Sequence, residues 1–228
     1  MGRNGYRELM AARAAESAKT TRPRRAPGQR APRGTISRAQ IVEAALRALR
    51  TVGFEQMTIR SLAGDLDVAP MSLYRYIRDK DDLMDEVVEE LLIQNQPMPA
   101  ASGSWQARLG AAAEGLRRLL VEEPGALYVY LRHPVISPTA IRRMETMLKI
   151  LRDAGYDTAA SKTAYAAIQT YTIGFAALET SRAGWTPPEG TSRTASELVA
   201  MTSPKQFASG LRYLLSGIER DAERGGAS

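Results

Sequence analysis

The sequence predicts an all-α protein with a small N-terminal three-helix domain and a larger C-terminal antiparallel helical bundle. From Ser37 onward, apolar residues recur at three- and four-residue spacing, which is the period of an amphipathic helix. Prolines, glycines and capping hydroxyl residues separate these segments where helices begin and end. One short segment, YVYL at 128–131, is typical of a strand by composition, but no partner strand lies nearby, so we expect it to be helical too.

Length and composition exclude several classes of protein. The 228 residues are enough to bury a sizeable core, as one large or two small domains. The chain has no cysteine, which excludes disulfides, thiolate metal sites and a cysteine nucleophile and favours a cytoplasmic location. It has neither a run of about 18 apolar residues nor an N-terminal apolar stretch before a cleavage site, so we expect no membrane partner and no secretion.

The basic charge is concentrated at the N-terminus. The formal net charge is +6, and residues 1–33 alone carry +7, from nine arginines and lysines against two glutamates. Together with three prolines, this composition predicts a disordered arm over 1–33. Two interpretations of the arm stay open: a solubilising extension, or a segment that contacts DNA phosphates or enters a minor groove.

The first helix is predicted to begin after Ser37. Gln40 lies three residues further on, and this pair forms a capping box that satisfies the free amides at a helix start. Gly53 is expected to end the helix. Its buried face is predicted to hold Ile41, Ala45, Leu49 and Val52.

The next two helices follow the plan of a helix-turn-helix motif. Thr58 is predicted to cap a short second helix, and the connector DLDVAP leads to a third helix that begins at about Pro70. On that third helix Leu73 and Ile77 share the inner face. The outer face is then expected to present Met71, Ser72, Arg75 and Tyr76.

This outer face suits the major groove of DNA. Hydroxyl groups bond base edges or phosphates there, and an arginine can bind guanine through two hydrogen bonds. Arg60 and Lys80 are expected to flank the third helix, where they would contact phosphates and position the protein. A solvated Arg75 and a Met71 that only fills space are the alternative interpretations.

The run TIRSLAGDLDVAPMSLYRYIRDKDDLMDEV, Thr58 to Val87, resembles the DNA-binding domain of the tetracycline-repressor (TetR) family. The resemblance extends over Ser37 to Leu92 and includes the threonine-capped helix, the LYRYI core and the KDDL start of the following helix. The chain departs from the family pattern at the turn, where Asp67 replaces the usual glycine, and at Ile77, where phenylalanine is frequent. Aspartate adopts the left-handed conformation at modest cost, so we expect the turn to be kept.

The resemblance implies which residues contact DNA, with the hydroxyl of Tyr74 and the ammonium of Lys80 on phosphates. The implied set is Thr58, Arg60, Met71, Ser72, Tyr74, Arg75, Tyr76 and Lys80.

The remaining chain is predicted to form a second, helical domain. Residues 34–96 make up the DNA-binding domain, a linker follows, and residues 104–224 form the bundle, with Ser104 as its first cap. We expect a helical turn within 125–134, a helix that ends near Gly155, a long helix over 158–183 and a last helix over 204–224. The helix before Gly155 is expected to turn Ile141, Met144, Leu148 and Leu151 inward.

The resemblance implies a homodimer built by the last two helices of each subunit and a small-molecule site inside the bundle. A row of small residues on the long helix, at 166, 170, 174 and 177, would let a partner helix approach closely. A mainly apolar effector is expected, although the same residues also suit a plain core. The candidate lining is Trp105, Leu116, Tyr128, Met144, Met147, Ile168, Tyr171, Phe175 and Trp185.

The leading hypothesis is a dimeric repressor that binds an inverted-repeat DNA operator and is released by its effector. One alternative is an architectural DNA-binding protein without an effector, and a weaker one is an all-helical enzyme. His133 is the single histidine, and the paired acidic residues are adjacent on helices and point apart, so we expect no catalytic site, no metal and no cofactor.

Overall fold

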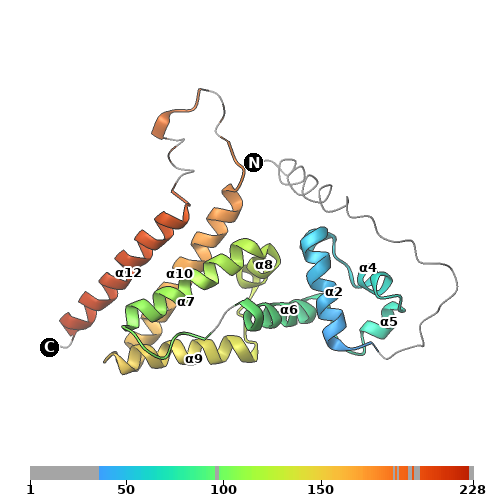
Figure 1. Ribbon diagram of the computed structural model, residues 1–228, viewed down its shortest axis with the longest axis horizontal. Helices are drawn as coiled ribbons and strands as arrows, with labels where there is room; N and C mark the ends of the chain where they lie inside the picture. The colour runs from blue at the N-terminus through green and yellow to red at the C-terminus, as the bar shows by residue number, and fades with distance from the viewer. Residues whose placement is uncertain are drawn as a thin grey trace. The chain divides into compact units, whose positions relative to one another are not determined.

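The computed structural model describes residues 36–95, 98–186, 188, 190–194, 197 and 201–225. Within these ranges all regular structure is helical, as predicted (Figure 1). The predicted arm, 1–33, lies outside the described residues. The helices are α2 (Arg38–Thr51), α3 (Gly53–Gln56), α4 (Ile59–Asp65), α5 (Pro70–Leu73), α6 (Lys80–Asn95), α7 (Trp105–Glu122), α8 (Pro124–Arg132), α9 (Pro138–Asp153), α10 (Thr158–Arg182) and α12 (Pro204–Gly225).

The chain divides into two compact units, one ending at Leu83 and the other beginning at Met84. The division therefore falls inside α6, whereas the sequence analysis put the domain boundary in the linker after residue 96. α6 is one continuous helix through this point. No helix among the described residues is long and apolar enough to cross a membrane.

In the N-terminal unit, the start of α2 is the predicted capping box. The Ser37 hydroxyl oxygen accepts a hydrogen bond from the Gln40 amide at 3.2 Å, and the Ser37 amide donates to Gln40 Oε1 at 2.8 Å. Ile41, Ala45 and Leu49 are buried as predicted. Val52 is not, and its side chain is 46% exposed, because it is the C-cap residue beyond which Gly53, at φ +79°, turns the chain.

The turn between α4 and α5 keeps its geometry without a glycine. Asp67 has φ +54°, as the sequence analysis expected for this position. The Val68 amide donates to the Ala63 carbonyl at 3.0 Å and the Asp67 amide to the Gly64 carbonyl at 3.2 Å. These two bonds form a Schellman motif, which closes the end of α4 and directs the chain into α5.

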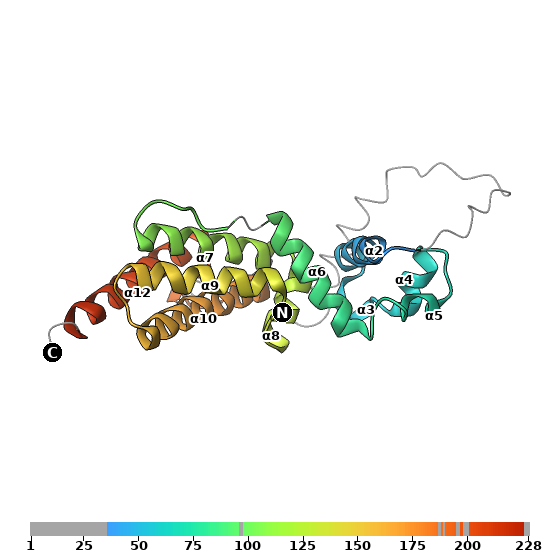
Figure 2. The ribbon, with the colours of Figure 1, turned by 90° about the horizontal axis from the view of Figure 1, so that it is seen from below.

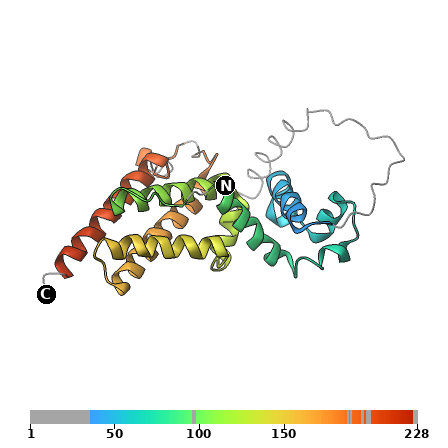
Figure 3. The same ribbon diagram turned by 60° about the horizontal axis from the view of Figure 1, so that its bottom comes forward.

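In the C-terminal unit α7, α9 and α10 run side by side, and α12 packs against α7 and α10 (Figures 2 and 3). Ser104 caps α7 as predicted, accepting from the Ala107 amide at 3.2 Å. The predicted turn within 125–134 is the helix α8, and the two long C-terminal helices lie where they were expected. Aromatic rings fill the centre: Phe207 stacks on Tyr171 at 5.2 Å and meets Phe175 edge-on at 5.2 Å.

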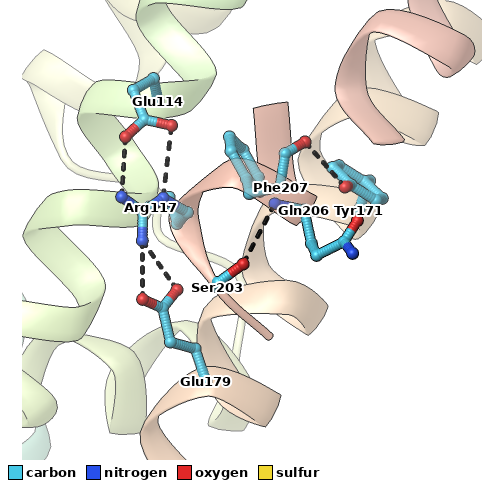
Figure 4. Close-up of polar contacts among 7 residues, drawn as sticks. All are labelled: Glu114, Arg117, Tyr171, Glu179, Ser203, Gln206 and Phe207. Carbon is cyan, nitrogen blue, oxygen red and sulfur yellow. Dashed lines mark hydrogen bonds and ion pairs between the residues drawn. The ribbon is translucent and has the colours of Figure 1, made fainter. Parts of the chain in front are cut away.

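Polar contacts join helices α7, α10 and α12 (Figure 4). Buried Arg117 of α7 binds Glu114, one turn before it, and both carboxylate oxygens of Glu179 on α10, at 2.7 and 2.9 Å. Its guanidinium also lies 5.3 Å from the centre of the Phe207 ring on α12. The Tyr171 hydroxyl donates to the Phe207 carbonyl at 2.9 Å. These bonds hold α7, α10 and α12 in one arrangement.

Candidate nucleic-acid interface and ligand cavity

The segment expected to enter DNA is a shorter helix than the sequence predicted. α5 ends at Leu73, so Arg75 and Tyr76 lie in the turn that follows it and not on the helix itself. The Leu73 carbonyl accepts from both the Tyr76 and the Ile77 amides, at 2.8 and 3.1 Å, and the resulting tight turn ends the helix. Leu73 and Ile77 are nevertheless buried, so the inner side of the segment is as predicted, whereas Ser72 and Tyr76, expected on the outer side, are half-buried.

The outer side of this segment exposes the apolar, aromatic and basic groups expected for a DNA contact. Met71 is 74% exposed and Tyr74 49% exposed, although both have large apolar side chains. Arg75 and, on α4, Arg60 are exposed. Neither guanidinium has a hydrogen bond or ion pair with any residue in the described part of the chain. Both are therefore available to phosphates or base edges.

The other candidates for DNA contact have roles inside the unit. The Thr58 hydroxyl oxygen accepts from the Ser61 amide at 3.0 Å and so caps α4. The Lys80 ammonium donates to the Phe54 carbonyl at 2.5 Å and lies 3.8 Å above the centre of the Phe54 ring. Ser72 and Tyr76 are half-buried. Lys80 thus fixes the start of α6 against α3.

A cavity of about 560 Å³ lies within the C-terminal unit. Its volume is in the range of sites that hold drug-sized ligands. Segments from α7, the end of α8, the following connector, α9 and α10 enclose it. The lining is Leu109, Ala112, Ala113, Leu116, Tyr130, Leu131, Arg132, His133, Pro134, Val135, Ile136, Ala140, Ile141, Arg143, Met144, Met147, Tyr165, Ile168, Gln169 and Ile173.

The structure brings only part of the candidate lining together. Leu116, Met144, Met147 and Ile168 line the cavity. On α9, Ile141 and Met144, which were expected in the core, are more than a third exposed because they face this space.

The other five candidates lie elsewhere, and this corrects the predicted set. Tyr171 and Phe175 pack around Phe207. Trp105 lies edge-on to Tyr156 at 5.4 Å, which places it in the core. Tyr128 accepts a hydrogen bond from Arg132, and Trp185 follows the end of α10.

The polar part of the lining was not predicted from the sequence. Arg143, Tyr165 and Gln169 all line the cavity, and the Gln169 amide donates to the Tyr165 hydroxyl at 2.9 Å. Arg143 is only 5% exposed. Burial lowers the pKa of its guanidinium, and the nearby phenols of Tyr130 and Tyr165 act in the opposite direction. Arg143 lies four residues before buried Met147 on α9, but arginine ordinarily lies on the solvated face of a helix, so its residue type argued against burial.

Burial also affects the two phenols. Tyr130 has a pKa raised far above its ordinary value by burial, and burial raises that of Tyr165 as well. Both hydroxyls are therefore neutral at physiological pH and act as hydrogen-bond donors.

The cavity frame is tied to α6 by two contacts within the C-terminal unit. The Glu89 carboxylate of α6 accepts from the Thr139 amide at 3.0 and 3.1 Å and from the Thr139 hydroxyl at 2.5 Å. Thr139 stands in the first turn of α9, where the helix dipole favours a carboxylate. His133 Nε2, from the lining, lies 3.8 Å from Asp85 Oδ1 on α6.

Burial acts to raise the pKa of Glu89. Hydrogen bonds from Ser137 and Thr139, together with the charge of Arg142, outweigh burial and hold that pKa below its ordinary value. The carboxylate is therefore ionised at neutral pH.

An exposed helix-turn-helix unit joined to a helical unit with an internal cavity defines a class of DNA-binding regulatory proteins, and comparison with known proteins agrees. The family model described as "Bacterial regulatory proteins, tetR family" matches residues 41–87. The model described as "Tetracyclin repressor-like, C-terminal domain" matches residues 97–206. The chain belongs to the TetR family of bacterial regulatory proteins.

Individual relatives agree with this assignment. The HTH-type transcriptional repressor DrrR1 of Streptomyces coeruleorubidus is 30% identical over 64% of this chain and 55% of its own length. An HTH-type transcriptional regulator of Saccharopolyspora erythraea and the class D tetracycline repressor of Escherichia coli are also covered over less than two thirds of their length, at 61% and 64%.

Solved structures share the fold. A possible TetR family transcriptional regulator from Streptomyces coelicolor A3(2) has a TM-score of 0.72 at 26% identity, over 81% of this chain and 99% of that one. A TetR variant from Acinetobacter baumannii AYE, solved in complex with minocycline, has a TM-score of 0.70 at 22% identity, over 81% of this chain and 94% of that one.

Proposed function

We propose that the protein is a dimeric transcriptional repressor that binds an inverted-repeat DNA operator and leaves it when a small molecule occupies the cavity of the C-terminal unit. The observation that carries the proposal is the exposed surface around α5, where Met71, Tyr74 and Arg75 are exposed together with Arg60 of the contacting helix α4. Such a surface suits the major groove. DrrR1, a relative, is named a transcriptional repressor, and the neighbour from Acinetobacter baumannii binds minocycline.

The role proposed is regulatory and not catalytic, and a DNA-bound regulator would act in the cytoplasm. The described residues contain no group of three or more metal-binding side chains. Family membership and the DNA-contact surface support regulation, and no arrangement of nucleophile and base among the described side chains argues for a reaction.

Release is proposed to run through α6. Ligand in the cavity would contact α9 residues such as Met144 and Met147, and α9 is bonded to α6 through Thr139 and Glu89. α6 begins at Lys80, directly after the segment expected to contact DNA. A displacement of α6 would then reach the DNA-contact segment through the chain itself. For a useful switch the ligand must prefer the released form by about 100-fold.

The test is a selection of duplexes from a random-sequence library with the purified full chain, followed by affinity measurement. We expect one inverted repeat to be enriched and bound about 1,000-fold more tightly than random duplex. Arg75→Ala should weaken binding to that repeat by roughly 10- to 100-fold.

Arg47→Ala is the matched control, because Arg47 is an exposed arginine of α2 that pairs with Glu43 at 2.5 Å. It should leave affinity for the selected repeat nearly unchanged. Uniform, salt-sensitive recovery of all duplexes would instead support the architectural alternative and overturn the proposal.

A further inference from the structure

Two phenols in the cavity of the C-terminal unit have protons that no acceptor among the described residues takes. Tyr130 of α8 and Tyr165 of α10 both line the cavity. The Tyr130 hydroxyl forms no hydrogen bond with any residue in the described part of the chain. The Tyr165 oxygen accepts from the Gln169 amide at 2.9 Å, so its own proton is left for another acceptor. Two hydrogen-bond donors therefore serve the cavity.

The two phenols lie near each other and are shielded from water. Burial raises the pKa of Tyr130 and of Tyr165, and the phenol of Tyr165 adds to the rise at Tyr130. A hydroxyl that loses its hydration costs free energy unless an acceptor reaches it. The described lining contains no aspartate or glutamate, so the protein places no carboxylate acceptor there. An oxygen atom of a ligand can supply the missing acceptor.

The exposed part of the lining is largely apolar. Leu131 at the end of α8, Ile136 in the following connector and Ile141 on α9 line the cavity and are 60%, 72% and 39% exposed. Large apolar side chains that face both the cavity and the solvent border its opening. Arg132 is also exposed there, but it binds Tyr128 on its own helix. The shielded donors and this apolar opening therefore favour a ligand that enters with its polar end first.

We infer that the ligand of this cavity is a mainly apolar molecule with a carbonyl oxygen that accepts hydrogen bonds from Tyr130 and Tyr165, and that its apolar end lies toward the opening at Ile136. The inference rests on the ligand-binding part of the proposed function and specifies the class and orientation of the ligand. A carbonyl oxygen has two lone pairs, so it can accept from two phenols at once. The leucine, isoleucine and methionine side chains of the lining would contact the carbon skeleton.

The test uses two naphthalene probes with the same framework. The first, 6-propionyl-2-(dimethylamino)naphthalene, carries a carbonyl group, and 6-propyl-2-(dimethylamino)naphthalene lacks it. Tyr130→Phe and Tyr165→Phe each remove one donor from the purified full chain and keep the ring. Each should weaken binding of the carbonyl probe by about threefold to tenfold and change binding of the propyl probe by less than about twofold. Equilibrium dialysis measures both affinities.

Fluorescence reports the hydrogen bond itself. Emission of the carbonyl probe moves to longer wavelength when its oxygen accepts a hydrogen bond, so both phenylalanine variants should shift the bound probe to shorter wavelength. Tyr213→Phe is the matched control, because it removes a hydroxyl from an exposed position of α12. It should change neither the affinities nor the emission.

Two variants of the lining locate the probes. Met144→Trp narrows the cavity from a partly exposed position and should weaken both probes, which shows that they bind inside it. Ile136→Ser, at the opening, should weaken both probes alike and leave the emission of the carbonyl probe unchanged. An emission shift in this variant would place the carbonyl at the opening and overturn the inferred orientation. Circular dichroism checks that each variant is folded.

Three results would overturn the inference: no binding of the carbonyl probe to the wild-type chain, equal losses for both probes in the phenylalanine variants, or unchanged affinity and emission in those variants. Binding of the selected DNA repeat is measured in parallel. A chain that binds the carbonyl through its phenols but binds no specific DNA would retain the inference and reject the repressor. A chain that binds its repeat without an effect of the phenols on the carbonyl probe would do the reverse.

Discussion

Two arginines in the described part of the C-terminal unit are buried, and their surroundings differ. Arg117 lies between the carboxylates of Glu114 and Glu179. Burial alone would lower its pKa, but hydrogen bonds to these two carboxylates raise it above its ordinary value, so the side chain stays charged. Arg143 lies near phenols and lines the cavity. The first arginine therefore has a structural role, whereas the second forms part of the cavity wall.

Arg117→Met should destabilise the C-terminal unit because it leaves the half-buried Glu179 without its cation. We expect the free energy of unfolding to fall by about 3 kcal/mol. Urea denaturation at fixed protein concentration measures the change, since dimerisation would contribute to stability. Arg47→Met, at an exposed ion pair, should stay within about 0.5 kcal/mol of the wild type. Equal stability of the two variants would contradict the structural role of Arg117.

At the scale of elements, short local signals determined the helix boundaries well. The capping box at Ser37, the caps at Thr58 and Ser104 and the left-handed Asp67 were all confirmed. Such signals depend on hydrogen bonds between residues a few positions apart, so the sequence contains both partners. The length of α5 was wrong, because two amides that converge on the Leu73 carbonyl stop the helix earlier than its apolar spacing indicates.

The pairing of α6 with α9 gives a prediction at the same scale. Thr139→Val removes the hydroxyl that donates to Glu89 and keeps the side-chain shape. We expect a loss of about 1.5 kcal/mol of stability in the C-terminal unit, with faster hydrogen exchange of the α6 amides. Thr139→Ser keeps the hydroxyl and should stay within about 0.5 kcal/mol of the wild type. If the valine and serine variants exchange equally fast, the Thr139 hydroxyl does not hold α6.

The hydrogen bond between Thr139 and Glu89 also predicts how the stability of the C-terminal unit changes with pH. The pKa of Glu89 is lowered in the folded chain, so the bond contributes stability above the ordinary pKa of a glutamate. That contribution is lost as the pH falls through the lowered folded value. The difference between wild type and Thr139→Val should therefore be largest near neutral pH and shrink below about pH 4.

At the scale of the whole molecule, one face of α10 is left open by the described residues. Ala166, Thr170, Gly174 and Leu178 follow one another at four-residue spacing and are all exposed. On α12, Tyr213 is 72% exposed. A row of small residues ending in an exposed leucine suits close packing with another helix, and this supports the proposed dimer.

Gly174→Arg should convert the dimer to a monomer because a long charged side chain would stand between the two subunits. A Cβ atom at Gly174 meets no atom within 4 Å, so the chain itself has room for the substitution. Sedimentation velocity at micromolar concentration measures the change. Gly64→Arg is the matched control, since it is an equally open helical glycine on α4, and it should remain dimeric. A wild-type chain that sediments as a monomer would contradict the proposed interface.

The sequence by itself determined the all-α fold, the helix-turn-helix order, most helix boundaries and the family, because each depends on periodicity, caps and motifs within a short stretch of chain. Only the tertiary structure decided which helix faces meet one another, which enclose a cavity and which stay open. Met144 on α9 and Phe175 on α10 each belong to a row of apolar residues at helical spacing. Met144 nevertheless lines the cavity, whereas Phe175 packs in the core. Helical periodicity states which residues share a face, whereas the surroundings of that face depend on segments distant in the sequence. Buried Arg143 shows the limit most clearly, since its helix packs against α7 and α10, and an arginine is expected on the solvated face until those neighbours are known.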